Sequence, residues 1–285
     1  MKLGVVSLGC VKNRVDTEEM LSFLQEDGFQ FVQDAGSAEV LVVNTCGFIA
    51  SAKEESIDAI LEMAQYKQEG ACKVLCVTGC LAQRYGQELL EQIPEIDVLT
   101  GVSQYPQLAG YIREALTGNR AGSTERGEDF TGCGRVLSTA PYTAYVRVSE
   151  GCDNRCAYCA IPLIRGGFRS RPMHSVLQEM RELAANGARE QILIAQDTTR
   201  YGSDLEGASL AALLGEAEKI AGIDWLRVLY CYPEQTDKAL IDAMAANSKL
   251  CRYLDLPLQH ASPKVLKRMN RRGDIAEIEQ LLRYA

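Results

Sequence analysis

The sequence predicts an α/β protein with two parts, an open parallel sheet followed by an incomplete (β/α) barrel. Three observations predict this organisation. Short apolar segments typical of buried strands alternate with longer segments of helical periodicity, which is the pattern of βα units and parallel sheets. A polar, glycine-containing segment without periodicity, 119–141, separates two such series and is expected to be a linker. The second series has four strand–helix units in a row, which indicates most of a barrel.

The first series, 1–118, is expected to form the open sheet. Its strands are short apolar runs, and its helices repeat apolar residues three or four positions apart, as at Met20 and Leu24. In the second helix, the residues predicted to face inward are Ile57, Ile60, Leu61 and Ala64. Strands are predicted at Leu3–Leu8, Val40–Asn44, Lys73–Thr78 and Asp97–Leu99, and helices at Thr17–Glu26, Ala52–Tyr66, Gln87–Gln92 and Leu108–Leu116.

The second series, 142–285, is expected to form the barrel. Strands are predicted at Tyr145–Ser149, Gln191–Ala195, Leu226–Tyr230 and Tyr253–Leu256, and helices at Ser175–Asn186, Leu210–Ala221, Lys238–Ala246 and Pro263–Met269. A further helical pattern, Ile275–Arg283, has no strand after it. We therefore expect the last strands of the barrel to be missing through C-terminal truncation.

Composition excludes several classes of protein. The chain carries 38 acidic and 30 basic residues, a net charge of −8, whereas non-specific binding of nucleic acid needs an excess of Lys and Arg. No apolar run is long enough for a membrane span, and Lys12 and Arg14 follow the first run too closely for a signal peptide. We expect a cytoplasmic protein without membrane association. Eleven cysteines in that reducing compartment indicate metal or redox chemistry.

The strongest motif is a C-x₃-C-x₂-C run, Cys152, Cys156 and Cys159, directly after a predicted strand. Three thiolates in one short loop can bind an iron–sulfur cube, which ordinarily takes four protein ligands. A missing fourth ligand leaves one iron open, as an open position does in catalytic metal sites. The alternative is a zinc site, but the only nearby histidine, His174, lies beyond a glycine- and arginine-rich stretch. The motif therefore favours an iron–sulfur cluster.

A second group, Cys10, Cys46 and Cys80, is dispersed along the first series. Each follows the carboxyl end of a predicted parallel strand and has a neighbouring glycine. Those strand ends form one edge of an open sheet, the usual ligand site, so the three thiols are expected to meet there. The alternative is three cysteines packed in the core as small apolar side chains. Cys72 and Cys76 are left out of both sites, Cys76 as a strand residue. Cys231 and Cys251 are interpreted as core packing, and Cys133 as a linker residue without a visible partner.

These motifs together resemble the radical SAM methylthiotransferases along essentially the whole chain. The segments that carry the resemblance are Ser7–Asn13, Asn44–Ile49, Thr78–Arg84, Ser149–Cys152, Arg169–Pro172 and Met269–Arg272. The resemblance implies an N-terminal methylthiotransferase domain at 1–118 and a truncated radical SAM domain at 142–285. It implies two 4Fe–4S clusters: one on Cys152, Cys156 and Cys159 that binds S-adenosylmethionine, and an auxiliary cluster on Cys10, Cys46 and Cys80.

The resemblance also implies a substrate. The segment Gln196–Gly202 is similar to the branch that adds a methylthio group to the β-carbon of an aspartate in small-subunit ribosomal protein S-twelve. The alternatives are an adenosine of tRNA as the substrate and, in another class, a non-enzymatic iron–sulfur protein. An electron donor such as flavodoxin or ferredoxin is implied, and no catalytic residue is assigned beyond the clusters. The candidate cofactor contacts are Tyr158, Gln196 and Asp197. The alternative role is simple packing for Tyr158 and helix capping for Gln196 and Asp197.

Overall fold

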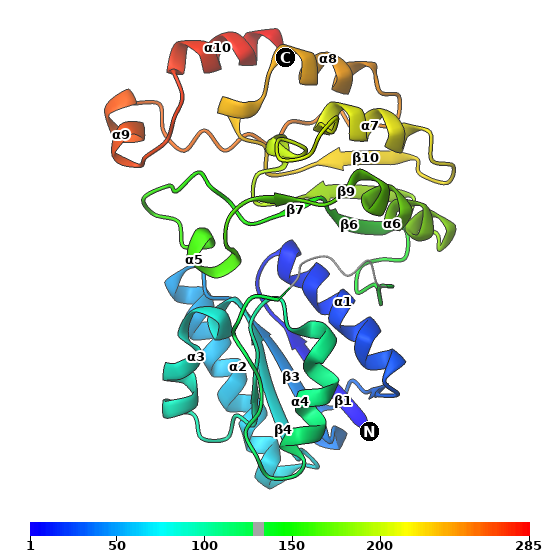
Figure 1. Ribbon diagram of the computed structural model, residues 1–285, viewed down its shortest axis with the longest axis vertical. Helices are drawn as coiled ribbons and strands as arrows, with labels where there is room; N and C mark the ends of the chain where they lie inside the picture. The colour runs from blue at the N-terminus through cyan, green and yellow to red at the C-terminus, as the bar shows by residue number, and fades with distance from the viewer. Residues whose placement is uncertain (128–133) are drawn as a thin grey trace. The chain divides into compact units, whose positions relative to one another are not determined.

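Two parallel sheets organise the chain, one in each of two compact units, Met1–Ser138 and Thr139–Ala285 (Figure 1). The computed structural model describes residues 1–127 and 134–285. Cys133, predicted to be a linker residue without a partner, lies outside the described residues. The predicted α/β class is confirmed in both units.

The sheet of the first unit is parallel throughout, with the strand order β2-β1-β3-β4-β5. The order reverses between β1 and β3, which makes their carboxyl ends the switch point where doubly wound sheets bind ligands. In the register, Val42 of β3 lies opposite Val5 of β1 and Cys76 of β4. The strands are β1 (Lys2–Ser7), β2 (Gln30–Phe31), β3 (Val40–Thr45), β4 (Val74–Gly79) and β5 (Val98–Leu99).

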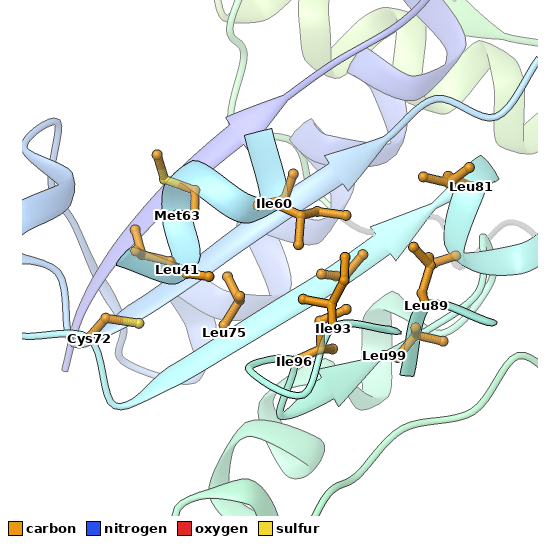
Figure 2. Close-up of a cluster of buried hydrophobic side chains, with 14 of the residues drawn as sticks. Leu41, Ile60, Met63, Cys72, Leu75, Leu81, Leu89, Ile93, Ile96 and Leu99 are labelled. Atoms are coloured by element: carbon orange, nitrogen blue, oxygen red, sulfur yellow. The ribbon is translucent and has the colours of Figure 1, made fainter. Parts of the chain in front are cut away.

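Helices cover both faces of this sheet. They are α1 (Val11–Glu26), α2 (Ala50–Glu69), α3 (Cys80–Gln92) and α4 (Leu108–Ala115). Alternate residues of a strand point to opposite faces, so the buried Val40 packs in the cluster that includes α1 and α4, whereas its neighbour Leu41 packs in the cluster that includes α2 and α3. Figure 2 shows the second cluster, in which Leu75 of β4 packs with Ile60 and Met63 of α2.

Two details of these helices differ from the sequence prediction. In α2, Ile60 and Ala64 are buried as predicted, but Ile57 is 37% exposed and Leu61 47% exposed. The buried face includes Ser56 and Met63 instead, because the hydroxyl of Ser56 binds the end of β3. Helix α1 begins at Val11, earlier than predicted, because its first turns bury polar side chains that conceal the apolar period.

The polar segment predicted as a linker is bonded to the first unit in both stretches that the structure describes. The amide of Leu99 donates to the carbonyl of Ala121 at 3.1 Å, and Gln83 donates to the carbonyl of Thr124 at 2.8 Å. Arg135 forms an ion pair with Glu18 of α1. Glu18 is fully buried, so its carboxylate needs such a partner to remain charged.

The second unit contains a parallel sheet with the order β10-β9-β6. Helix α7 contacts both α6 and α8, so the helices form a continuous layer. A short antiparallel pair, β7 with β8, closes an excursion of the chain at residues 151–168. The strands are β6 (Thr143–Arg147), β7 (Ser149–Glu150), β8 (Arg169–Ser170), β9 (Glu190–Ile194) and β10 (Trp225–Val228). The helices are α5 (Ile161–Arg165), α6 (Met173–Ala185), α7 (Leu210–Glu218), α8 (Lys238–Ala246), α9 (Pro263–Arg268) and α10 (Ile275–Tyr284).

The strand predicted at Tyr253–Leu256 is wrong. In this part of the described chain, only an isolated bridge joins Leu226 to Leu250. Beyond the bridge, Tyr230 adopts a left-handed φ of 62° and its amide donates to the side chain of Asp255 at 2.7 Å, in place of a backbone acceptor. Pro257, which has no amide hydrogen for a ladder, follows directly. None of the described helices is long and apolar enough to cross a bilayer.

Candidate metal centres

The first candidate centre lies at the carboxyl edge of the first sheet. Cys46 directly follows β3, Cys80 directly follows β4, and Cys10 is three residues beyond β1. Because β3 pairs with both β1 and β4, the three cysteine loops are neighbours. Cys80 is buried, Cys46 half-buried and Cys10 exposed. The structure therefore places this predicted group together at one edge rather than dispersed through the core.

The three loops contact each other directly. A methyl group added at Gly9 would lie 2.9 Å from Cβ and 3.2 Å from Sγ of Cys46. One added at Gly47 would lie 2.9 Å from the carbonyl oxygen of Cys80. These approaches are closer than a side chain allows, which is why glycine is needed beside the cysteines. The second loop is fixed from α2, whose Ser56 hydroxyl accepts from the Cys46 amide at 2.9 Å and donates to its carbonyl at 3.1 Å.

The second candidate centre is the loop between β7 and β8. Cys152 and Cys156 are buried, and Cys159 is half-buried. Backbone bonds shape the loop: the Cys152 amide donates to Gly166 at 3.1 Å, and the Cys159 amide to Cys156 at 3.0 Å. The Ala157 amide donates to Met269 at 3.0 Å, which fixes the loop to the end of α9.

Burial and mutual proximity affect the thiols of this loop. Burial, with the neighbouring cysteines adding to it, raises the pKa of Cys152 to about 11. The pKa of Cys159 is also raised, first by burial and then by Cys156. Tyr158 lies beside Cys156, and burial together with that thiol raises the pKa of its hydroxyl to about 12. The raised pKa values of Cys152 and Cys159 favour the thiol form, so these two cysteines must lose protons when they bind a metal.

Gln196 and Asp197 lie at the end of β9, close to this loop. Gln196 donates to Glu150 at 2.5 Å, and Asp197 accepts from Asn154 of the loop at 2.8 Å and from Thr199 at 2.8 Å. Burial raises the pKa of the Asp197 carboxyl, while these hydrogen bonds lower it. Asp197 therefore holds the cysteine loop in place rather than presenting a free carboxylate.

Sequence analysis missed Glu150 as part of the second centre. Its buried carboxylate accepts from Arg147 at 3.0 Å and from Arg165 at 3.3 Å, in addition to Gln196. The sequence signal for Glu150 was its position: it lies at the carboxyl end of a strand, two residues before the first cysteine. The two arginines come from β6 and α5, and their proximity depends on the folded loop.

A pocket of about 390 Å³ adjoins Cys156. Sequence analysis missed Arg271, which lines this pocket and is buried. Its guanidinium lies 4.2 Å from the centre of the Tyr232 ring and donates to Glu234 at 3.1 Å. Its Nε and Nη1 atoms are buried without a hydrogen-bond partner among the described residues. Other residues that line the pocket are Asp153, Asn154, Arg200 and Asn270.

Both groups suit iron–sulfur clusters in their donor chemistry. Each group offers three thiols from loops held by backbone and side-chain bonds. Within residues 1–127 and 134–285, no three His, Cys, Asp or Glu side chains already surround one metal position. The loops of each group are neighbours, and their thiol groups still have to turn towards a common centre to bind a cluster.

Comparisons with known proteins match a different family to each of the two parts of the chain. Residues 2–101 match the uncharacterized protein family UPF0004, and residues 146–285 match the Radical SAM superfamily. A solved radical S-adenosylmethionine methyltransferase, TsrM from Kitasatospora setae, superposes with a TM-score of 0.69 over 99% of this chain and 65% of that chain. Its sequence identity is 16%, so the likeness shows the fold alone.

Several curated relatives carry the name ribosomal protein uS12 methylthiotransferase RimO. The protein of Clostridium tetani is 48% identical over 99% of this chain and 64% of its own length. The protein of Desulforamulus reducens is 53% identical over 94% of this chain and 62% of its own length. The protein of Heliobacterium modesticaldum is 50% identical over 99% of this chain and 62% of its own length. The chain thus spans less than two thirds of these relatives. From this similarity and the two matched families, the chain belongs to the radical SAM methylthiotransferase family.

Proposed function

We propose that the protein is a methylthiotransferase that adds a methylthio group to the β-carbon of an aspartate in ribosomal protein uS12 (the S-twelve protein). The observation that carries the proposal is the pair of three-cysteine groups, one that follows strand ends in each unit. Two such groups suit a reaction that needs two clusters, and the relatives' names supply the substrate. An electron donor such as flavodoxin or ferredoxin and a cytoplasmic location belong to the same proposal.

In the second unit, Cys152, Cys156 and Cys159 would bind the radical SAM cluster. Three protein ligands leave one iron without a ligand from the chain. Bound there, the cluster and S-adenosylmethionine supply the one-electron chemistry and the methyl group that the transfer needs. Asp197 supports this loop through Asn154, and Glu150 joins it to Gln196.

The pocket beside Cys156 would bind the amino-acid end of S-adenosylmethionine. The free N–H groups of Arg271 suit its carboxylate, because a guanidinium donates to two oxygens at once. Glu234 and Tyr232 fix the guanidinium by an ion pair and by stacking, so little side-chain freedom is lost when a ligand binds. Tyr158, which is 48% exposed beside Cys156, is placed for contact with the adenosine end.

In the first unit, Cys10, Cys46 and Cys80 would bind the auxiliary cluster. Helix α1 begins directly after Cys10, and α3 begins at Cys80. The positive ends of both helix dipoles therefore lie at this edge, which suits a negatively charged group bound there. We propose residues 1–118 as the methylthiotransferase domain and 142–285 as the radical SAM domain, joined by 119–141.

The test is a transfer assay under anaerobic conditions. The chain, reconstituted with iron and sulfide, is incubated with S-adenosylmethionine, a reductant, a uS12 loop peptide and unmodified tRNA. We expect cleavage of S-adenosylmethionine and the mass gain of one methylthio group on the peptide's aspartate. A methylthio gain on tRNA adenosine instead would support the proposed chemistry and show that the proposed substrate is wrong. Cleavage that persists after alanine replaces Cys152, Cys156 and Cys159 would overturn the proposal.

A further inference from the structure

We infer that Asn13 is the positioning residue of the first centre, which holds the three cysteine loops in the arrangement that an auxiliary cluster requires. The inference rests on the proposed function, because it assigns a role at the cluster site of the first unit. Asn13 lies in the first turn of α1, and its side chain is completely buried at the edge of the sheet where the three loops meet.

One side-chain amide contacts all three loops. The Nδ2 atom of Asn13 donates to the carbonyl of Leu8 at 3.1 Å and to the carbonyl of Thr45 at 2.8 Å. Leu8 belongs to the loop of Cys10, and Thr45 directly precedes Cys46. The Oδ1 atom of Asn13 accepts from the thiol of Cys80 at 3.3 Å. This third contact needs the thiol proton, so it guides Cys80 before a metal binds, whereas the two Nδ2 bonds can persist afterwards. The amide therefore joins the chain segments that follow β1, β3 and β4.

The chemistry of these contacts requires asparagine. Two carbonyl oxygens face Nδ2, so the NH₂ group must point towards them and the oxygen towards Cys80. An aspartate of the same shape would direct a carboxylate oxygen, which cannot donate, at both carbonyls. The main chain of Asn13 is held as well, because Asn44 of β3 donates to its carbonyl at 3.0 Å. The residue is thus fixed from both sides.

A purely structural role would explain the burial but not the choice of partners. Helix α1 is already attached to the sheet by apolar residues in its later turns, among them Met20 and Leu24. The bonds made by the Asn13 side chain go instead to the segments that carry the cysteines. A structural role predicts loss of stability when Asn13 is replaced, whereas a positioning role predicts a change in the cluster itself.

The experiment uses a parent chain in which alanine replaces Cys152, Cys156 and Cys159, so that only the auxiliary cluster forms. Asn13→Ala and Asn13→Asp are compared in this parent, with Leu24→Ala as a matched control. Leu24 is buried in the same helix but distant from the loops, so its truncation lowers the stability of the unit without changing them. Iron retention against a ferrous chelator and the electron paramagnetic resonance spectrum of the reduced cluster are measured.

We expect both Asn13 variants to retain iron about 10- to 100-fold less well than the parent, as when outer partners of metal ligands are removed. Their residual cluster should give an altered spectrum, while Leu24→Ala keeps the parent's spectrum and iron. Parental retention and spectrum in both Asn13 variants would overturn the inference. The inference would also be overturned if Leu24→Ala lost iron in the same proportion to its loss of stability as the Asn13 variants do. It would equally be overturned if both Asn13 variants unfolded while Leu24→Ala remained folded, because that is the result of a structural role. A parent without a cluster would instead contradict the proposed auxiliary site.

Discussion

Replacing Gly79 by alanine should disrupt the turn that delivers Cys80 to the edge of the first sheet. Gly79 is the last residue of β4 and has a φ of 94°, a conformation that L-residues with side chains rarely adopt. An added Cβ would lie 2.2 Å from Oδ1 of Asn44, 2.5 Å from the carbonyl oxygen of Thr45 and 2.8 Å from its amide nitrogen. Both neighbours belong to the central strand β3, so they have little room to move.

The expected loss of stability has three parts. The backbone of Gly79, with a φ of 94° and a ψ of −160°, lies in a region essentially restricted to glycine, which costs about 1–3 kcal/mol for alanine. Relief of the contacts with β3 adds about 1–3 kcal/mol for overpacking. Displacing the Asn44 side chain, whose Nδ2 donates to Asn13 and to Thr17, adds about 1 kcal/mol for each weakened hydrogen bond. The sum is about 4–8 kcal/mol, a large part of the roughly 5–15 kcal/mol of an ordinary domain.

Gly28→Ala is the matched control. Gly28 has a similar φ of 84°, but nothing lies within 4 Å of an added Cβ. Its replacement should therefore cost only the backbone part, about 1–2 kcal/mol. Hydrogen exchange of the β3 and β4 amides, followed by mass spectrometry, reports the opening free energy of the first unit alone. Equal losses in the two variants would refute the claim that close approach, rather than backbone conformation, makes glycine necessary before Cys80.

Three further predictions follow from the sites and the core. Cys156→Ala should abolish cleavage of S-adenosylmethionine, whereas Cys46→Ala should leave cleavage but stop sulfur insertion; the same defect in both variants would contradict two separate centres. Arg271→Met should weaken S-adenosylmethionine binding to the reconstituted chain about tenfold or more, because a hydrogen bond to a charged group contributes about 1.5–3 kcal/mol. Equilibrium dialysis should show this, with Arg268→Met, an exposed arginine outside the pocket lining, as the control. Glu18→Gln breaks a buried ion pair and should cost about 3–5 kcal/mol in hydrogen exchange of α1, and a loss below about 1 kcal/mol would show that the pair is not needed for stability.

The sequence was sufficient for the fold class and for the strand ends that carry the cysteines. Apolar runs such as Val40–Asn44 and Lys73–Thr78 are clear signals because buried parallel strands are apolar on both faces. The structure places Cys46 and Cys80 directly after these strands, on neighbouring positions of one sheet. The motif of Cys152 was recognisable from spacing alone, because its three cysteines lie within one short loop.

Other features depend on side-chain contacts that spacing does not reveal. Asn13 has an ordinary polar position in the sequence, and its role depends on carbonyls that folding brings next to it. Arg271 lies among other basic residues in the sequence, and its contacts with Tyr232 and Glu234 form only when the chain folds. The strand predicted at Tyr253–Leu256 fails because a side chain, Asp255, takes the hydrogen bond that a ladder would need.

The most direct test of the account is a count of iron and sulfide after anaerobic reconstitution. The unaltered chain is compared with two variants, one with alanine at Cys10, Cys46 and Cys80 and one with alanine at Cys152, Cys156 and Cys159. Two 4Fe–4S clusters predict about eight iron atoms in the unaltered chain and about four in each variant. Four iron atoms in the unaltered chain, or loss of all iron in either variant, would contradict two independent centres.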